Sequence, residues 1–306
     1  MRLQLHPRRL RRHWLIPALL GMACCLCLAS WHTVLAEAPR STLFPLPEVL
    51  RPNVTFWKRV FAVFDTNGGV LLDTSDVSIV YEVWYNDLPN ETPLRQSIID
   101  EARARYRAAL MSLADGKRVN LSDDEERVWA MFGGKQHAAA FRAASGNMRF
   151  QGGMRSRFAQ GLLRSRSYMP EIESIFASMG LPQELTMLPH IESSFENRAM
   201  SKVGAAGIWQ LMPGTGRRFL RVAGDVDERF NIRQSTIAAA RVLRENYEML
   251  GNWPLAVTAY NHGPYGMKQA VATVGSSDFG VIVQQYRGPL FGFASQNFYA
   301  EFVAAV

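Results

Sequence analysis

Glu192 is the residue whose type and position first suggest chemistry. It follows Leu185 and Leu188 at spacings that put all three side chains on one face of a helix beginning near Pro182. A carboxyl group on an apolar helix face is partly desolvated, which raises its pKa and makes it a competent acid near neutral pH. An ordinary acidic residue at a helix end shows the same pattern, and this helix on its own favours that simpler interpretation.

Three motifs around and after this helix change the balance. Residues 191–195 are I-E-S-S-F, residues 201–215 are S-K-V-G-A-A-G-I-W-Q-L-M-P-G-T, and residues 259–263 are A-Y-N-H-G. In this order and spacing the set resembles the lytic transglycosylase family with a goose-lysozyme-like SLT domain, and most of all its membrane-bound type D branch. The resemblance covers residues 154–304, and it implies a mainly α-helical, lysozyme-like fold for this part of the chain.

The resemblance also implies a role for individual residues. Glu192 matches the catalytic acid and base of the family. The other matching side chains are expected to bind the glycan substrate or to approach the catalytic carboxyl: Ser201, Gln210, Met212, Tyr260, Asn261 and Tyr299.

Two positions depart from the commoner family pattern. Many relatives have a glutamate where Ser295 stands, which puts one substrate contact in doubt. Many have an aspartate where Asn231 stands, and this change is expected to be harmless because asparagine caps a helix about as well as aspartate.

The number of acidic residues in the motifs bears on the reaction. A glycosidase normally uses two carboxylates, but no second acid lies inside the motifs, and the acids near them are interpreted as solvated surface residues: Glu196, Asp225, Asp227 and Glu228. One carboxyl suffices if the substrate supplies the nucleophile. Glu192 would protonate the glycosidic oxygen leaving N-acetylmuramic acid and then accept the proton of that sugar's C6 hydroxyl. The 1,6-anhydro ring closes by an intramolecular attack, which has a large effective-molarity advantage.

Two other functions stay open. A hydrolytic muramidase would cut the same bond with water, and a non-catalytic peptidoglycan-binding scaffold would keep the fold without the reaction. The missing second carboxylate favours the lyase, and the intact motif around Glu192 argues against the scaffold. No cofactor and no metal are expected, because His190 and His262 have no acid or histidine at ligand spacing.

Helical signals dominate the region that would carry the motifs, which we place at residues 151–306. We predict one amphipathic helix over 154–179, another over 232–250 that stops at Gly251, a third capped by Asn252, and a last one over 297–306. Residues 53–150 are predicted to form a smaller accessory region. It would contain a β-hairpin between Val70 and Trp84, a helix over 94–114, and a capping box from Ser122 to Glu125.

The N-terminal residues have the parts of an export signal. Five arginines precede an apolar run, no acid occurs before Glu37, and small residues near Ala36 and Ala38 offer a cleavage zone. We therefore predict a signal peptide over 1–38, a proline-rich linker over 39–52, and export to the periplasm or cell envelope. A retained membrane anchor or a lipid-modified Cys24 are the alternatives, so membrane association stays open.

Charge and cysteine content exclude several classes of function. The formal net charge of +7 belongs largely to the five N-terminal arginines, so it gives no evidence for nucleic acid as a partner. All three cysteines lie in the apolar run, which excludes disulfides and thiol catalysis in the cleaved chain. The expected partner is the glycan strand of peptidoglycan, and the sequence gives no indication of the oligomeric state.

Overall fold

The computed structural model describes residues 42–90, 92–134 and 138–306. The expected signal peptide and the three cysteines lie outside the described residues. Within the described part of the chain, no helix is long and apolar enough to cross a membrane.

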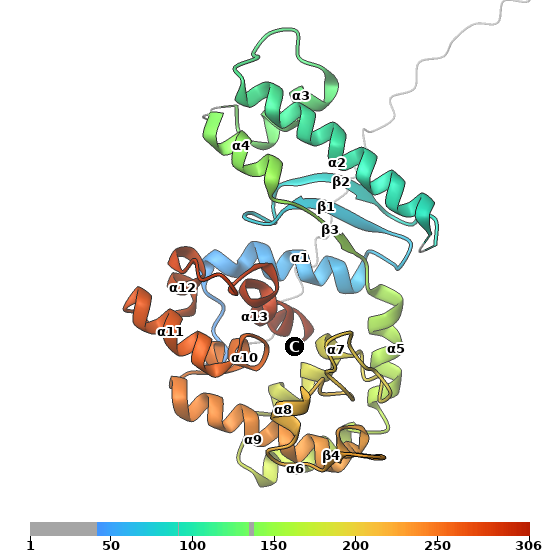
Figure 1. The fold of residues 1–306 in the computed structure, drawn as a ribbon, viewed down its shortest axis with the longest axis vertical. Helices are drawn as coiled ribbons and strands as arrows, with labels where there is room; N and C mark the ends of the chain where they lie inside the picture. The colour runs from blue at the N-terminus through green and yellow to red at the C-terminus, as the bar shows by residue number, and fades with distance from the viewer. Residues whose placement is uncertain (1–41, 91, 135–137) are drawn as a thin grey trace, which may run out of the picture. The chain divides into compact units, whose positions relative to one another are not determined.

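A three-stranded antiparallel sheet lies in the N-terminal region (Figure 1). The predicted hairpin is confirmed: β1 (Gly69–Asp73) pairs with β2 (Val80–Trp84). A strand that the sequence did not indicate, β3 (Met148–Gly152), pairs with the other edge of β1, giving the order β2-β1-β3. Its sequence M-R-F-Q-G lacks the β-branched residues that usually mark a strand.

Helix α2 (Pro93–Ala114) covers one face of this sheet, and two further helices pack against α2. They are α3 (Asp123–Met131) and α4 (Ala138–Gly146). Tyr81 of the sheet and Tyr106 of α2 belong to their shared core. The predicted helix over 94–114 and the capping box between Ser122 and Glu125 are both confirmed.

The other face of the sheet belongs to the large helical core. Val70 and Leu72 of β1 join the same hydrophobic cluster as residues of α1 (Arg51–Ala62), which packs on α13 (Phe293–Ala305). The chain before α1 is packed as well. Phe44 contacts the rings of Trp253 and Phe302 at 5.9 and 5.1 Å, and a short 3₁₀ helix, η1 (Glu48–Leu50), leads into α1. The described part of the predicted linker is therefore held against the helical core.

The predicted single helix over 154–179 is wrong, because two helices occupy these residues. They are α5 (Arg155–Ser165) and α6 (Met169–Ser178). Pro170 lies at the start of α6, where its missing N–H costs nothing, and a proline inside a continuous helix would break the hydrogen-bond ladder.

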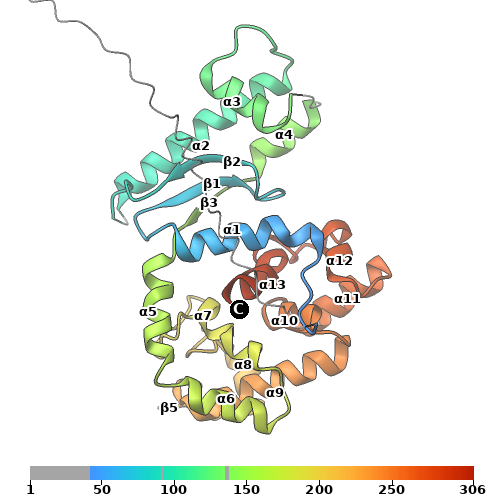
Figure 2. The same cartoon turned by 180° about the vertical axis from the view of Figure 1, so that it is seen from behind.

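The remaining helices surround the motifs. After α6 come η2 (Gln183–Met187), α7 (Leu188–Glu192) and α8 (Pro213–Gly216). The small hairpin of β4 (Val222–Ala223) and β5 (Val226–Asp227) leads into η3 (Glu228–Phe230). Then follow α9 (Ile232–Leu250), α10 (Trp253–His262), α11 (Pro264–Val274), α12 (Phe279–Gln285) and α13. Figures 1 and 2 show α7 between α5 and α13, and it contacts both.

Helix ends in this region follow the predicted capping residues. The side chain of Asn231 accepts a hydrogen bond from the backbone of Gln234 at the start of α9, and α9 ends at Gly251 in the left-handed conformation. Asn252 caps α10 in the same way through the backbone N–H of Leu255. The departure at Asn231 therefore preserves the helix cap, as expected.

Candidate active site

Glu192 lies at the end of a short helix that is fixed by burial. Leu185 and Leu188 are completely buried, so the helix face predicted to be apolar is part of the core. Immediately after Glu192 the chain reverses, because Ser194 and Phe195 both have positive φ values of 52° and 57°. Such a conformation is strained for residues with side chains, and it persists only where the surroundings impose it.

Arg164 of α5 supplies part of that constraint. Its guanidinium donates two hydrogen bonds, at 3.0 and 2.7 Å, to the backbone carbonyl of Ser194. Gly161, one turn earlier on α5, allows the close approach, because a Cβ atom there would lie 3.0 Å from the same carbonyl oxygen. Helix α5 therefore holds the turn that ends the helix of Glu192.

The carboxyl of Glu192 is in a protein environment that favours its neutral form. The side chain is only partly exposed, and no protein donor makes a hydrogen bond to it among the described residues. Burial, and then the nearby carboxyl of Glu301, raise the pKa of Glu192 to about 8. Glu192 is therefore protonated at neutral pH, which is the form a general acid requires.

Glu301 on α13 is the site residue that sequence reasoning missed. It is also partly exposed, and it lies on a helix that contacts α7. Burial raises the pKa of Glu301, whereas the positive charge of Arg149 on β3 lowers it. The available signal was one acidic residue in an otherwise uncharged helix, F-A-S-Q-N-F-Y-A-E-F-V-A-A.

Tyr260 of α10 also lies close to Glu192. Burial and the charge of Glu192 raise the pKa of the Tyr260 hydroxyl, and this hydroxyl donates to the backbone carbonyl of Trp209 at 2.8 Å. The Trp209 ring is fully buried, is stacked on Phe176, and donates from Nε1 to Thr236. Trp209 is thus a core residue that anchors the motif loop beneath Tyr260.

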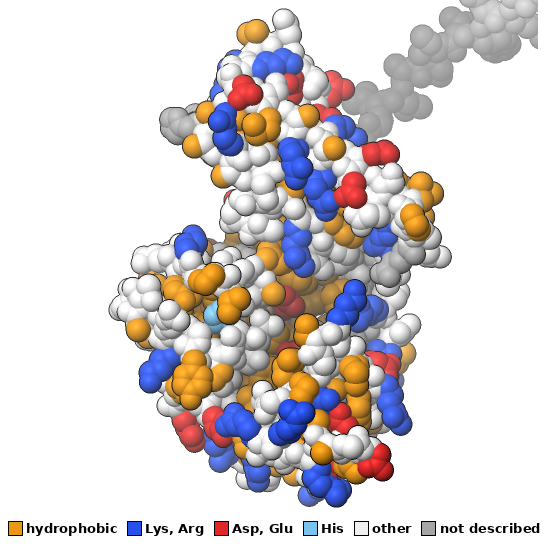
Figure 3. Space-filling view, in the orientation of Figure 1, with side chains coloured by type: hydrophobic (Ala, Val, Ile, Leu, Met, Phe, Trp, Pro, Cys, Tyr) orange, Lys and Arg blue, Asp and Glu red, His pale blue; other side chains and the backbone are white. Residues whose placement is uncertain are grey.

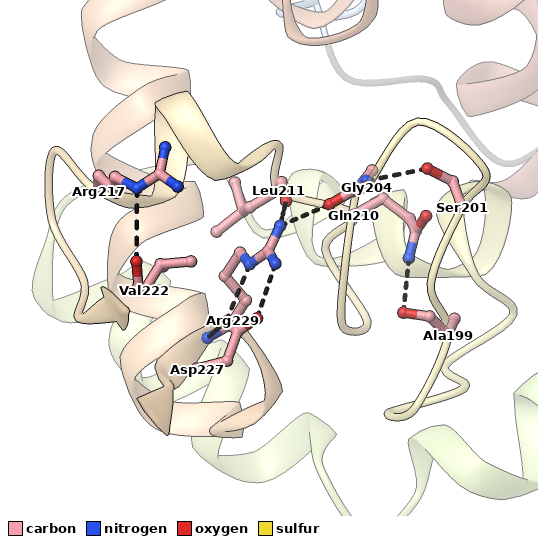
Figure 4. A network of polar contacts seen from close by, with 10 residues as sticks. Ala199, Ser201, Gly204, Gln210, Leu211, Arg217, Val222, Asp227 and Arg229 are labelled. Carbon is pink, nitrogen blue, oxygen red and sulfur yellow. Dashed lines mark hydrogen bonds and ion pairs between the residues drawn. The ribbon is translucent and has the colours of Figure 1, made fainter. Parts of the chain in front are cut away.

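The loop that carries the second motif is held from below by Arg229 (Figure 4). This buried guanidinium donates to the backbone carbonyls of Gly204 and Leu211 at 2.6 and 2.9 Å, and it forms an ion pair of 2.7 Å with Asp227. The backbone of Arg229 also requires a glycine at position 207, since a Cβ atom there would lie 2.1 Å from the Arg229 carbonyl oxygen.

The structure places the motif residues of this loop in different surroundings. The hydroxyl of Ser201 accepts from the Ala205 N–H at 2.9 Å, so it closes the loop while remaining partly exposed. Gln210 has a φ of 46° and donates to the carbonyls of Ala199 and Gly207. Its amide nitrogen is therefore engaged in hydrogen bonds within the loop. Met212 exposes 43% of its surface, which leaves it available to a ligand.

The expectation that Tyr299 binds substrate needs correction. Its side chain is fully buried, its ring packs against Phe279 and Phe302, and its hydroxyl donates to the Pro45 carbonyl at 2.8 Å. Tyr299 instead fastens the chain before α1 to the helical core. The family resemblance alone gives no information on which helix face Tyr299 occupies.

Asn261, by contrast, is exposed. Its side-chain oxygen accepts from Ser295 at 3.4 Å, and Ser295 also contacts the Nδ1 atom of His262 at 3.0 Å. Ser295, which departs from the family pattern, is therefore in hydrogen-bond contact with Asn261 of the third motif.

The other acids and histidines near the motifs have structural surroundings. His190 is buried between Phe158 and Phe195, and burial lowers its pKa to about 4. Asp227 and Glu228 are partly exposed acids that also form ion pairs with neighbouring arginines. Asp227 pairs with Arg229, and Glu228 accepts hydrogen bonds from the backbone and side chain of Arg221.

The two remaining acids near the motifs are exposed. Asp225 is exposed, as predicted. Glu196 is also exposed and lies 3.9 Å from Arg164. Within the described ranges, no group of three or more His, Cys, Asp or Glu side chains could hold a metal ion.

Figure 3 shows that this face of the molecule is hollowed, with acidic and hydrophobic atoms inside the hollow. In the orientation shared with Figure 1, the hollow lies over α7 and α13. Concave sites that combine apolar side chains with a few polar groups are the usual setting for a bound ligand.

The helices around Glu192 and Glu301 form a mainly α-helical domain. Residues 171–282 match the family model described as "Transglycosylase SLT domain", which confirms the resemblance that the motifs predicted. Glu192 and Tyr260 both lie inside the matched residues, whereas Glu301 lies beyond them.

Two curated relatives extend this comparison. The chain is 38% identical over 113 residues to the membrane-bound lytic murein transglycosylase D of Escherichia coli strain K12, and equally to that of E. coli O6:H1. The match covers 36% of this chain and 25% of each relative, so the chain spans about a quarter of the length of the relatives it matches. Among solved structures, lytic transglycosylase Slt of Pseudomonas aeruginosa has 19% identity and a TM-score of 0.40, and the match covers 69% of this chain and 32% of that chain.

Proposed function

We propose that this protein is a peptidoglycan lytic transglycosylase that cuts the β-1,4 bond between N-acetylmuramic acid and N-acetylglucosamine. The observation that carries the proposal is Glu192, a partly buried carboxyl with a pKa raised to about 8, placed inside an SLT domain. A neutral carboxyl at physiological pH can donate the proton that the leaving glycosidic oxygen needs.

The same carboxyl then acts as the base. After it has given up its proton, Glu192 is ionised and can accept the proton of the C6 hydroxyl of the muramic acid residue. The glycosidic bond breaks first, and the substrate's own N-acetyl group stabilises the positive charge left on the anomeric carbon. The C6 oxygen then attacks this carbon while its proton passes to Glu192. The products are a 1,6-anhydro-N-acetylmuramic acid end and a free N-acetylglucosamine end, and Glu192 has recovered its proton.

A hydrolytic muramidase is the second candidate, and Glu301 is the observation that favours it. The preference for the lyase rested on a missing second carboxylate, but Glu301 supplies a carboxyl close enough to affect the charge of Glu192. In an inverting hydrolase the second carboxylate activates a water molecule on the opposite face of the sugar. The presence of Glu301 therefore makes the product the decisive measurement.

Mass spectrometry of digested sacculi in water enriched in ¹⁸O separates the two candidates. The lyase yields muropeptides that end in 1,6-anhydro-N-acetylmuramic acid, lighter by one water and free of the label. A muramidase yields reducing ends that carry ¹⁸O. The absence of both kinds of product, with a folded protein, would support the non-catalytic scaffold.

Export places the enzyme where its substrate lies, and we propose the periplasm or cell envelope as its location. The support is the arginine-rich and apolar N-terminal sequence and the name of the relatives, which describes those proteins as membrane-bound. N-terminal analysis of the mature protein tests the predicted cleavage near Ala36 or Ala38. An intact Met1 or a retained apolar run would instead establish a membrane anchor.

A further inference from the structure

A chain of three polar side chains connects α13 to the exposed end of α10. Ser295 is 6% exposed, and its hydroxyl lies 3.0 Å from Nδ1 of His262 and 3.4 Å from Oδ1 of Asn261. The His262 ring is held in place by the edge of Phe291, at 5.2 Å between ring centres, and by α11, where a Cβ atom on Gly266 would lie 2.7 Å from Nε2. Ser295 and His262 are therefore held in place by the surrounding protein, whereas Asn261 is exposed.

The hydrogen atoms in this chain can be assigned by counting. A serine hydroxyl has one hydrogen to donate, and Ser295 donates it to Oδ1 of Asn261. The contact with His262 must then use a hydrogen on Nδ1, which donates to the Ser295 oxygen. Burial lowers the pKa of His262, so the neutral ring with its hydrogen on Nδ1 fits this arrangement near pH 7.

The consequence concerns the other end of the Asn261 amide. The side-chain oxygen of Asn261 accepts the hydrogen bond from Ser295. No hydrogen bond in the described part of the chain uses its Nδ2 hydrogens. Asn261 is exposed and belongs to the motif beside Tyr260. The amide therefore presents two donors, and no acceptor, to anything that binds there.

We propose that Ser295 and His262 are positioning residues that orient Asn261 so that its Nδ2 group donates to a carbonyl oxygen of the substrate. This inference rests on the proposed function, in which the site binds an amino-sugar chain. A carbonyl oxygen only accepts hydrogen bonds, so a group that offers only donors is complementary to the acetamido carbonyl of such a sugar.

This orientation also accounts for the unusual residue at position 295. A glutamate at this position would be an acceptor, and it would attract the Nδ2 hydrogens of Asn261 away from the ligand. The oxygen of Ser295 accepts a hydrogen bond from His262, so the serine donates its one hydrogen to the side-chain oxygen of Asn261 instead. The departure at Ser295 thus changes which end of the Asn261 amide faces the substrate.

Binding of glycan in a catalytically inactive background tests the inference independently of turnover. The parent is Glu192→Gln, and the probe is a soluble, uncross-linked oligomer of N-acetylglucosamine and N-acetylmuramic acid, measured by calorimetry. Ser295→Ala and His262→Phe should each weaken binding about three- to ten-fold, the range for one neutral hydrogen bond. Asn261→Asp should weaken it at least ten-fold, because aspartate presents only acceptors to a carbonyl oxygen.

A double-mutant cycle distinguishes positioning from a general structural effect. In an Asn261→Ala background, Ser295→Ala should have no further effect on binding, because the group it orients is gone. The matched control is Ser165→Ala, since Ser165 is equally buried and its hydroxyl bonds only within α5. That change should leave binding unaltered, and thermal melting checks that each variant is folded.

The outcomes that overturn the inference differ from those that overturn the proposed function. Additive effects of Ser295→Ala and Asn261→Ala, or undiminished binding by Asn261→Asp, would show that Ser295 does not set the donor direction of the amide. Failure of the parent to bind any glycan, together with no cleavage of sacculi by the wild-type protein, would instead reject the proposed function.

Discussion

Burial, and then the carboxyl of Glu301 on α13, raise the pKa of Glu192 at the end of α7. Both side chains are partly exposed, and neither accepts a hydrogen bond from a protein donor among the described residues. Two desolvated carboxyls this close do not ionise independently, so the first proton is lost from the pair rather than from one residue. Arg149 favours the ionised form of Glu301, which leaves the shared proton on Glu192.

Replacing Glu301 by glutamine should therefore move the pH–rate profile. Burial is the main cause of the raised pKa of Glu192, and the charge of Glu301 adds to it. Glu301→Gln removes this second contribution, so the pKa of Glu192 should fall. The alkaline limb of kcat/KM on soluble glycan strands should shift to lower pH by on the order of one unit. The other groups near the pair are Arg149 and Tyr260, which are unchanged in this variant.

The shape of the profile decides between two roles for Glu301. A shifted alkaline limb with near wild-type activity at low pH supports an electrostatic role. A loss of activity at every pH with no shift would contradict it, and would assign Glu301 a direct part in the reaction, as a muramidase requires.

The same substitution should stabilise the fold above neutral pH. A carboxyl whose pKa is higher in the folded than in the unfolded state stabilises the fold fully below its unfolded pKa, and this contribution is lost as the pH rises through the folded value. For Glu301 that range runs from the ordinary value of 4.5 to about 8. Glu301→Gln should therefore raise the melting temperature by roughly 2–8 °C at pH 8, for about 1–2 kcal/mol, and by much less at pH 4.5. An equal increase at both pH values would contradict this explanation.

Much of the fold could be predicted from the sequence because its signals are local. The caps of α9 and α10, the capping box before α3 and the hairpin of β1 and β2 each depend on residues a few positions apart. The strand β3 and the packing of the chain around Phe44 depend on contacts with distant segments. The break between α5 and α6 was available in Pro170, but the apolar periodicity on both sides obscured it.

The same difference between local signals and distant contacts applies to the residues of the candidate site. Glu192 could be recognised because its motif and the apolar face of its helix both depend on residues that are close to it in the sequence. Glu301 could not, since only the packing of α13 against α7 brings it there. Tyr299 shows the opposite difference, because the family resemblance implies a substrate contact although its side chain is buried.

The ion pair beneath the motif loop should be necessary for stability. Asp227→Asn leaves the guanidinium of Arg229, which is 5% exposed, without its charge partner, and should lower the free energy of unfolding by about 2–4 kcal/mol. Hydrogen bonds from Arg229, and then its charge, lower the pKa of Asp227. This stabilisation is therefore present above the ordinary pKa of 3.8 and is lost as the pH falls below it.

Denaturant unfolding at pH 7 measures the effect of this pair. Asp225→Asn is the matched control, because Asp225 is exposed in the same hairpin. Equal stability of the two variants would show that the pair with Arg229 contributes nothing.

Two hydroxyls next to the site should affect turnover more than folding. Ser201→Ala and Tyr260→Phe each remove a hydroxyl that is partly exposed and bonded to the motif loop. We expect activity to fall on the order of ten- to a thousand-fold, the range for a positioned hydrogen bond in a transition state, with a small change in melting temperature. Tyr265→Phe is the control for the tyrosine, because Tyr265 is 78% exposed at the start of α11. Wild-type rates for both site variants would place the active site elsewhere.

Glu192 itself should be indispensable. Glu192→Gln keeps the shape of the side chain but removes both the acid and the base, so sacculus digestion should fall by more than the roughly 10²–10⁴ typical of a single general-acid step. Because the pKa of Glu192 is raised in the fold, the variant should also melt at a higher temperature than the wild type at pH 8. The control is Glu196→Gln, four residues further along the chain and exposed, which should keep most of the activity. Substantial digestion by Glu192→Gln would refute the proton transfers assigned to Glu192, whereas loss of activity in Glu196→Gln would show that a second acid next to the motif takes part.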